Sequence, residues 1–291
     1  MLSALNDREG ARVPAGVRVI DSHVHLFPEG VYAALRKWFE RFAWPIRYAL
    51  DADGVVDFLV SRGVERVVGL AYSHAPGMAE SLNRFMADLA RRRPEVIGCG
   101  TVLPGEPNAR GIVARALGDL GLRGIKIHCH VQCVAPDDPR LDPVYEEATR
   151  ARRPVVIHAG REPACEGYAC DPHSICSAER VGRALRRHPE LTLVVPHLGA
   201  DEFQAFEALL DDFPNLYLDT TMMLADYFPI APDSEVLRRR ADRLLFGSDF
   251  PNLPYAWDRE LVRIGAAALP GPASENILWR NAVRVFDLSL H

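Results

Sequence analysis

Five side chains that can bind a metal ion each stand at the end of a short apolar run. They are His23, His25, His158, His197 and Asp249. The runs before them have the length and composition of buried parallel strands. Because functional groups in a barrel of parallel strands lie at the carboxyl ends of those strands, the five side chains can meet around one ion. The sequence therefore predicts a metal centre.

The pair His23 and His25 carries the clearest geometric argument. Residues two apart in a strand point to the same face, so both imidazoles can bind one ion. Together with His158 and Asp249 they make a ligand set that suits one zinc ion and also accepts manganese, cobalt, nickel or iron. Such a set keeps a position open for water, which is typical of a catalytic metal. Each histidine alone could be an ordinary hydrogen-bonded group, but the ordered set favours the metal.

On these residues the chain resembles the amidohydrolase superfamily. The resemblance is to the branch that contains predicted TIM-barrel metal-dependent hydrolases and relatives of aminocarboxymuconate semialdehyde decarboxylase. It rests on the His-x-His of His23 and His25, on His158, on Pro-His at His197, and on Gly-Ser-Asp at Asp249. It implies a hydrolase in which metal-activated water attacks an amide, ester or lactone of a small organic acid or aromatic compound. A metal-dependent non-oxidative decarboxylase with the same ligands is the alternative, and metal-independent lactonases occur among related sequences.

The resemblance also implies roles for residues beside the metal. In decarboxylase-like relatives the histidine at the place of His197 moves protons, whereas in binuclear relatives it binds a second ion. Those binuclear enzymes carry a carboxylated lysine at about the position of Lys126. Lys126 could also contact substrate or pair with an acid, and we expect it to be uncarboxylated. His128, at the same strand end, either faces the substrate or packs. Asp249 is expected both to bind the metal and to accept a proton from the attacking water.

Two further polar residues have competing interpretations. Asp219, which ends another apolar run, either orients a ligand histidine or caps the irregular segment that follows, and the cap is slightly favoured. Arg161 could bind a substrate carboxylate through its two-pronged guanidinium, or pair with Glu162 or Glu166 to fix its own loop. This loop, residues 160–177, is long and rich in Cys, Pro and Gly. Loops of that length are typically lids or binding loops, so we expect it to cover the metal.

Eight apolar runs alternate with amphipathic helical patterns, which is typical of β-α-β units around a parallel sheet. We expect strands near residues 17–27, 66–71, 95–103, 124–128, 154–158, 192–197 and 216–220, and a last strand ending at residue 249. Eight strands without a Gly-x-Gly-x-x-Gly phosphate motif favour a (β/α)8 TIM barrel over a doubly wound sheet. Helices near 256–267 and 274–286 complete one distorted barrel domain over residues 1–291, with an extra C-terminal helix.

The composition of the chain argues against nucleic-acid and membrane partners. The chain has 291 residues and a net charge of −5, which argues against a nucleic-acid surface. It has no apolar run of membrane-spanning length and no visible signal peptide, so we expect a cytoplasmic enzyme without a membrane partner. We also expect a small-molecule substrate, and a homodimer stays open. The six cysteines are expected to be free thiols, with a disulfide closing the loop or a second metal site as alternatives.

Overall fold

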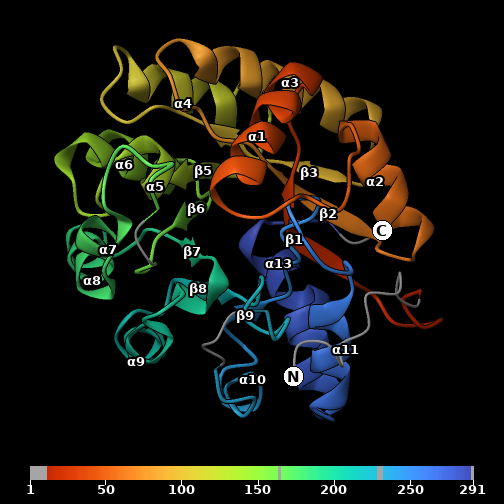
Figure 1. The fold of residues 1–291 in the computed structure, drawn as a ribbon. Coiled ribbons are helices and arrows are strands. Elements are labelled where there is room, and N and C mark those ends of the chain that lie inside the picture. The colour runs from red at the N-terminus through yellow and green to blue at the C-terminus, as the bar shows by residue number, and fades with distance from the viewer. Residues whose placement is uncertain (1–11, 163–164, 228–231, 290–291) are drawn as a thin grey trace.

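The computed structural model describes residues 12–162, 165–227 and 232–289. All of its strands are parallel to their neighbours, and the helices lie around the outside (Figure 1). The strands are β1 (Ile20–His25), β2 (Arg66–Leu70), β3 (Val96–Gly98), β4 (Gly100–Thr101), β5 (Ile125–His128), β6 (Val155–His158), β7 (Leu193–Val195), β8 (Leu216–Asp219) and β9 (Leu244–Leu245). Each predicted strand is present, although most are shorter than predicted.

The third predicted strand is divided in two because the chain changes partner at Cys99. Cys99 N donates to Gly69 O on β2, and Gly100 N donates to Gly124 O, just before β5. The result is a three-stranded sheet, β1-β2-β3, and a six-stranded sheet, β4 to β9 in sequence order. The first strand also meets the last segment, since His25 N donates to Phe250 O. The strands thus follow the order of a distorted (β/α)8 barrel, which confirms the predicted fold.

The helices fill the connections between strands. They are α1 (Glu29–Phe42), α2 (Ala52–Ser61), α3 (Met78–Arg92), α4 (Ala109–Leu117), α5 (Cys129–Gln132), α6 (Asp142–Arg150), α7 (Pro172–Ile175), α8 (Ala178–Arg187), α9 (Phe203–Asp212), α10 (Val236–Arg239), α11 (Arg259–Ala266), α12 (Gly271–Glu275) and α13 (Asn281–Val285). A π-helical turn, Asn276–Arg280, joins α12 to α13. Among the described residues, no helix has the length and apolar content needed to cross a membrane.

The inside of the barrel is apolar, and the C-terminal segment closes one end of it. Alternate side chains of the strands, among them Ile20, Val68 and Val194, form a buried cluster with Val285 and Phe286. Burying this apolar surface stabilises the barrel by about 25 cal/mol per Å² removed from water. Because the C-terminal segment packs against this cluster, the predicted extra helix has a structural role.

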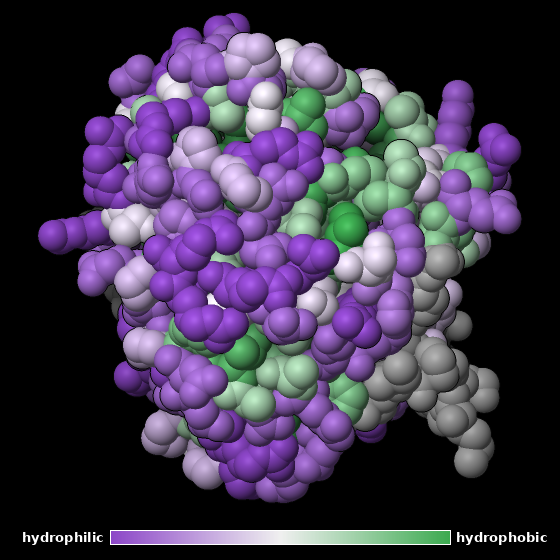
Figure 2. Space-filling view, turned by 90° about the vertical axis from the view of Figure 1, so that its left-hand side faces the viewer, coloured by the Kyte–Doolittle hydropathy of each residue, from purple (hydrophilic) through white to green (hydrophobic). Residues whose placement is uncertain are grey.

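The outer face over α6 and α8 is mostly hydrophilic, with smaller hydrophobic areas between the polar residues (Figure 2). Arg180 and Arg183 of α8 both pair with Asp137, at 2.9 and 2.7 Å. All three side chains are partly buried, and ion pairs that are still open to solvent typically contribute at most about 1 kcal/mol each.

Candidate metal centre and cavity

Three of the predicted ligands converge at the ends of the first and last strands. His23 Nε2 and His25 Nε2 lie 3.3 and 3.2 Å from the same Asp249 Oδ1. The three side chains are buried, and their ligand atoms all lie within 4.8 Å of one another. Two imidazoles and a carboxylate are the donors that zinc and similar divalent ions prefer. The cluster is therefore fitted to hold a divalent cation.

Local backbone geometry brings Asp249 to the histidines. The residue has a φ of 68°, in the left-handed region that residues other than glycine seldom adopt and that asparagine and aspartate tolerate best. Asp249 N donates to His23 O at 3.0 Å, which ties this turn to β1. The sequence pattern predicted that Asp249 follows a strand. The left-handed turn explains how the Asp249 side chain points back over β1.

Asp219 orients His23. Its Oδ2 lies 2.8 Å from His23 Nδ1, and both side chains are fully buried. Its Oδ1 accepts hydrogen bonds from His197 N and Thr221 N, at 3.0 and 3.1 Å. The ring proton of His23 therefore lies on Nδ1, and the unprotonated Nε2 faces the metal position beside Asp249 and Lys126. Both interpretations of Asp219 hold, since it orients the histidine and also binds the backbone of the irregular segment.

Asp21 is a supporting residue that the sequence analysis missed. Its Oδ1 accepts from His23 N and Ser248 N, both at 3.1 Å, and its Oδ2 accepts from Ser248 Oγ at 2.5 Å. Burial raises the pKa of this carboxyl to about 7. The signal was present, because an aspartate stands two residues before the His-x-His pair and so points to the same side of the strand.

Lys126 lies below the metal cluster. Its side chain is fully buried and its Nζ is 3.4 Å from His23 Nε2. Burial lowers the pKa of the lysine to about 8, although Asp219 and Asp249 oppose this effect. The predicted uncarboxylated state stays a prediction. Lys126 is not among the described residues that line the cavity, so the structure places it at the metal cluster rather than against a substrate.

His158 has a different neighbourhood from the one predicted. Its Nε2 lies 2.8 Å from Glu162 Oε1, and His130 Nδ1 lies 3.3 Å from Glu162 Oε2. These three residues form a second group whose ligand atoms are within 4.8 Å of one another. Burial lowers the pKa of His158 to about 3. Burial also opposes the charged form of His130, but Glu162 and Cys176 outweigh it and raise that pKa to about 10. The role of His158 as a ligand of the first ion stays a prediction.

His130 is the second residue that sequence analysis missed. It lies on α5, the four-residue helix that follows β5, and it is fully buried. The sequence signal was a second His-x-His, formed with His128. His128 itself lines the cavity and also packs, because its ring stacks on His158 with centroids 4.1 Å apart. The two interpretations of His128 are thus compatible.

His197 stands between the two groups. Its ring centroid is 5.6 Å from that of His23 and 4.6 Å from that of His158. Its Nδ1 lies 3.1 Å from the carbonyl oxygen of Thr221, so Nδ1 carries the proton and donates. Its buried Nε2 has no hydrogen-bond partner within the described part of the chain. An imidazole fixed in this way presents one free nitrogen to the cavity, as a proton-transfer group must.

A cavity of about 370 Å³ opens over both groups. Its wall is strongly aromatic, and the contributing side chains are Trp38, Phe39, Phe42, Trp44, Tyr72 and Tyr168. The described part of the 160–177 loop supplies Glu162, Cys165 and Tyr168 to the cavity wall. That the loop covers the metal stays a prediction. Trp38 on α1 contacts this loop, since Trp38 Nε1 donates a hydrogen bond to Gly167 O at 3.1 Å. Residues 163–164 lie outside the described part.

Arg161 does not reach this cavity. It is not among the described residues that line it, its side chain is 41% exposed, and its Nε lies 3.5 Å from Glu202 Oε1. The expected ion partners, Glu162 and Glu166, are therefore replaced by Glu202. Its substrate role stays a prediction that the geometry does not favour.

One further expectation concerns the cysteines. All six cysteines are free thiols, as predicted.

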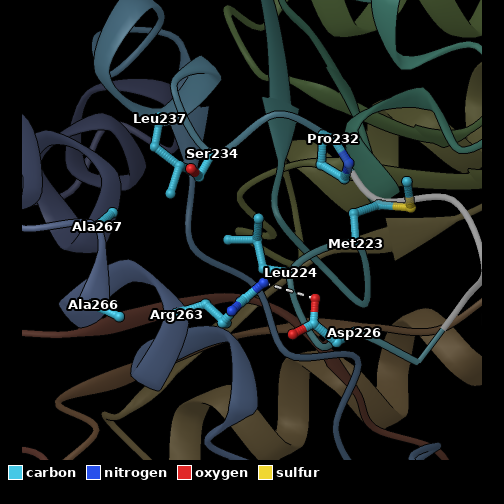
Figure 3. Close-up of a pocket in the computed structure, with 9 residues that line it drawn as sticks. All are labelled: Met223, Leu224, Asp226, Pro232, Ser234, Leu237, Arg263, Ala266 and Ala267. Carbon is cyan, nitrogen blue, oxygen red and sulfur yellow. Dashed lines mark hydrogen bonds and ion pairs between the residues drawn. The ribbon is translucent and has the colours of Figure 1, made fainter. Parts of the chain in front are cut away.

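A smaller hollow of about 140 Å³ lies between α10, α11 and the segment after β8 (Figure 3). Its polar side chains are Asp226 and Arg263, which pair at 2.8 Å, and Ser234. The described lining offers no imidazole or thiol, so the larger cavity is the better candidate for chemistry.

Comparison with known proteins identifies the family. The family model described as Amidohydrolase matches residues 20–288. The chain therefore belongs to the amidohydrolase family, as its metal-ligand pattern predicted. A search of curated proteins found no significant match.

Solved structures agree on the fold. A 5-carboxyvanillate decarboxylase from Sphingomonas paucimobilis is similar, with 20% identity, a TM-score of 0.70, and coverage of 94% of this chain and 100% of the other. A 2,6-dihydroxybenzoate decarboxylase from Rhizobium has 15% identity, a TM-score of 0.68, and coverage of 93% and 98%. A 5-carboxyvanillate decarboxylase from Novosphingobium aromaticivorans, solved with bound manganese, has 16% identity, a TM-score of 0.66, and coverage of 96% and 100%. At these identities the likeness establishes the fold.

Proposed function

We propose that this protein is a metal-dependent non-oxidative decarboxylase of a small aromatic carboxylic acid. The observation that carries the proposal is the aromatic wall of the cavity, which leads directly to His25 and Asp249. Trp38, Trp44 and their neighbours offer flat apolar faces of the kind that bind a substituted benzene ring. Buried imidazoles and a carboxylate stand at the other end of the same space.

The neighbouring structures support the same reaction. Two of them are decarboxylases of 5-carboxyvanillate and one is a decarboxylase of 2,6-dihydroxybenzoate. Both compounds are aromatic acids with an oxygen substituent on the ring carbon next to a carboxylate. Zinc, which the sequence favoured, remains our prediction for the ion. The manganese in one neighbour shows that manganese should be tested beside it.

The residues divide the work as follows. His23, His25 and Asp249 would hold a divalent cation, which would supply positive charge for binding an anionic substrate. The aromatic wall positions the ring and excludes water, which strengthens charge interactions. His197, with Nδ1–H fixed on the carbonyl of Thr221, takes up a second proton from solvent at Nε2 and delivers it to the ring carbon that carries the carboxylate. A C–H bond forms there, the C–C bond to the carboxylate breaks, its electron pair restores the aromatic ring, and CO2 leaves.

Hydrolysis of an amide, ester or lactone, the first function that the sequence suggested, is the competing prediction. The same cation and proton-transfer groups would serve it. An amidohydrolase-family enzyme is shown by the family match, but that match does not choose between the two reactions.

A paired substrate panel separates them. Protein loaded with zinc or with manganese is incubated with hydroxylated benzoic acids and with the methyl esters of the same acids, and CO2 and free acid are both measured. We expect CO2 from at least one acid and no hydrolysis of the esters. Asp249→Asn should abolish turnover, whereas His188→Gln, which changes a histidine outside the site that pairs with Asp142, should not. Ester hydrolysis with no CO2 from any acid would overturn the proposal.

A further inference from the structure

Tyr72 brings a buried hydroxyl group to the wall of the large cavity. The residue lies two positions after the end of β2, is 6% exposed, and lines the cavity together with His25 and Asp249. We propose that the Tyr72 hydroxyl donates a hydrogen bond to an oxygen substituent on the ring of the substrate, which makes Tyr72 a specificity-determining residue. This inference rests on the proposed function for the class of ligand, an aromatic acid, and adds the group on that ligand which the wall recognises.

The Tyr72 hydroxyl has no hydrogen-bond partner among the described residues. Buried tyrosine hydroxyls usually find a partner, because leaving a polar group unpaired costs free energy. The oxygen is also absent from the unpaired polar atoms that the protein encloses completely. It is therefore open to the cavity, where a ligand can supply the missing acceptor.

The phenol ring is held in place by three neighbouring rings. Its centroid lies 5.7 Å from that of His25, 5.1 Å from that of Phe27 and 4.7 Å from that of His128. All three contacts are edge-to-face, with interplanar angles of 85°, 81° and 69°. A donor fixed in this way loses little conformational entropy when a ligand binds, so its hydrogen bond can discriminate between ligands.

The backbone beside Tyr72 is fixed as well. Ser73 N donates to Thr101 Oγ1 at 3.1 Å, and Ser73 O accepts from Gln132 Nε2 at 2.8 Å. These bonds join the segment after β2 to its neighbours in the barrel. The position of the hydroxyl is thus set by the scaffold and does not depend on the loop of residues 160–177.

Electrostatics place the hydroxyl near the metal cluster and keep it a donor. Burial, and to a smaller extent Asp249, raise the pKa of the phenol, so the hydroxyl keeps its proton and lies within electrostatic reach of Asp249. A substrate carboxylate drawn to the metal cluster brings the ring of the same ligand into the space that Tyr72 lines.

The other charged groups of the wall do not suit a ring oxygen. The described lining contains no arginine or lysine, and its acidic side chains are Glu162, Asp201 and Asp249. Ionised carboxylates accept hydrogen bonds and cannot donate them. Tyr168, the other tyrosine of the lining, belongs to the loop and is more exposed than Tyr72. A ring oxygen near the metal cluster therefore finds its best placed donor in Tyr72.

Pairs of ligands matched in size test the proposal without turnover. The 2-, 3- and 4-methoxybenzoates are each compared with the ethylbenzoate of the same substitution, in which a methylene replaces the acceptor oxygen. Both members of each pair are titrated calorimetrically into zinc-loaded protein, and the ratio of their Kd values measures the preference for oxygen. Tyr72→Phe, which removes only the hydroxyl, should shift this ratio about 5-fold towards the ethyl ligand for at least one pair, the usual effect of one neutral hydrogen bond. Its Tm should stay close to that of the wild-type protein, because the hydroxyl bonds to no other described residue.

The matched control is Tyr217→Phe, since Tyr217 is a buried tyrosine on β8 that is not part of the described cavity lining. It should leave all three ratios unchanged. Unchanged ratios in Tyr72→Phe would overturn the role of Tyr72 and leave the proposed reaction standing. A shifted ratio in a protein that releases no CO2 from any acid would support the role of Tyr72 and count against the reaction. Failure of all six acids to bind the wild-type protein would overturn both.

Discussion

Replacing Asp219 by asparagine should weaken metal binding at the first centre without touching a ligand. The carboxylate accepts three hydrogen bonds, one from His23 Nδ1 at 2.8 Å and two from backbone N–H groups, of His197 and Thr221. Asparagine has a single acceptor oxygen. If that oxygen stays with the two backbone groups, the amide NH2 faces His23, and the ring must move its proton to Nε2.

A proton on Nε2 blocks the nitrogen that the metal needs, so the affinity of the first centre for the metal should fall. Loss of such an orienting partner typically weakens metal affinity about 10- to 100-fold, which corresponds to roughly 1.4–2.7 kcal/mol. Zinc affinity is measured by competition with a chromophoric chelator. Asp142→Asn, which removes the partner of His188, is the control and should leave the affinity unchanged. An equal zinc affinity in Asp219→Asn and its parent would refute this account of how His23 is oriented.

Three further variants test separate parts of the structure. His197→Gln should lower kcat by about 10²- to 10⁴-fold, the usual contribution of a proton-transfer group, while metal content stays unchanged; loss of metal would instead make His197 a ligand. Arg161→Ala should leave KM nearly unchanged, because the side chain lies outside the cavity; a large rise in KM would restore its predicted role in binding substrate. Glu260→Gln should be stabilising at neutral pH, because burial raises the pKa of this carboxyl well above its usual value. The folded parent holds a proton that the unfolded chain releases above pH 4.5. The gain in free energy of unfolding from glutamine should therefore grow by up to about 1.4 kcal/mol per pH unit. Urea unfolding of both proteins at pH 5 and pH 8 measures this gain, and the same gain at both pH values would contradict the prediction.

The barrel could be predicted because its signal is local. Each buried strand is a short apolar run, and each predicted ligand directly follows one, so the pattern that gave the fold also gave His23, His25 and Asp249. The C-terminal helix was visible from its periodicity. The division of the third strand could not be seen, since it depends on Cys99 and Gly100 bonding to two different neighbouring strands.

Residues of the 160–177 loop were harder to place. The backbone of Arg161 pairs with Ala200, and successive residues of an extended segment point to opposite sides. Glu162 therefore faces the cavity and Arg161 faces away, a choice that depends on a contact across the fold. His130 was overlooked because α5 is only four residues long and leaves no periodic pattern. The predicted site differs from the observed one at these residues because their positions depend on contacts with distant parts of the chain. Residue types alone do not reveal such contacts.

The most direct test of the central claim is the fate of the substrate carboxylate in heavy water. Metal-loaded protein is incubated in D2O with the best acid from the panel, and the ring is followed by proton and deuterium NMR while CO2 is collected. The account predicts that one deuterium appears on the carbon that carried the carboxylate, in step with one CO2, and that both stop when the metal is removed. Consumption of substrate with the carboxylate still attached to the ring would contradict it.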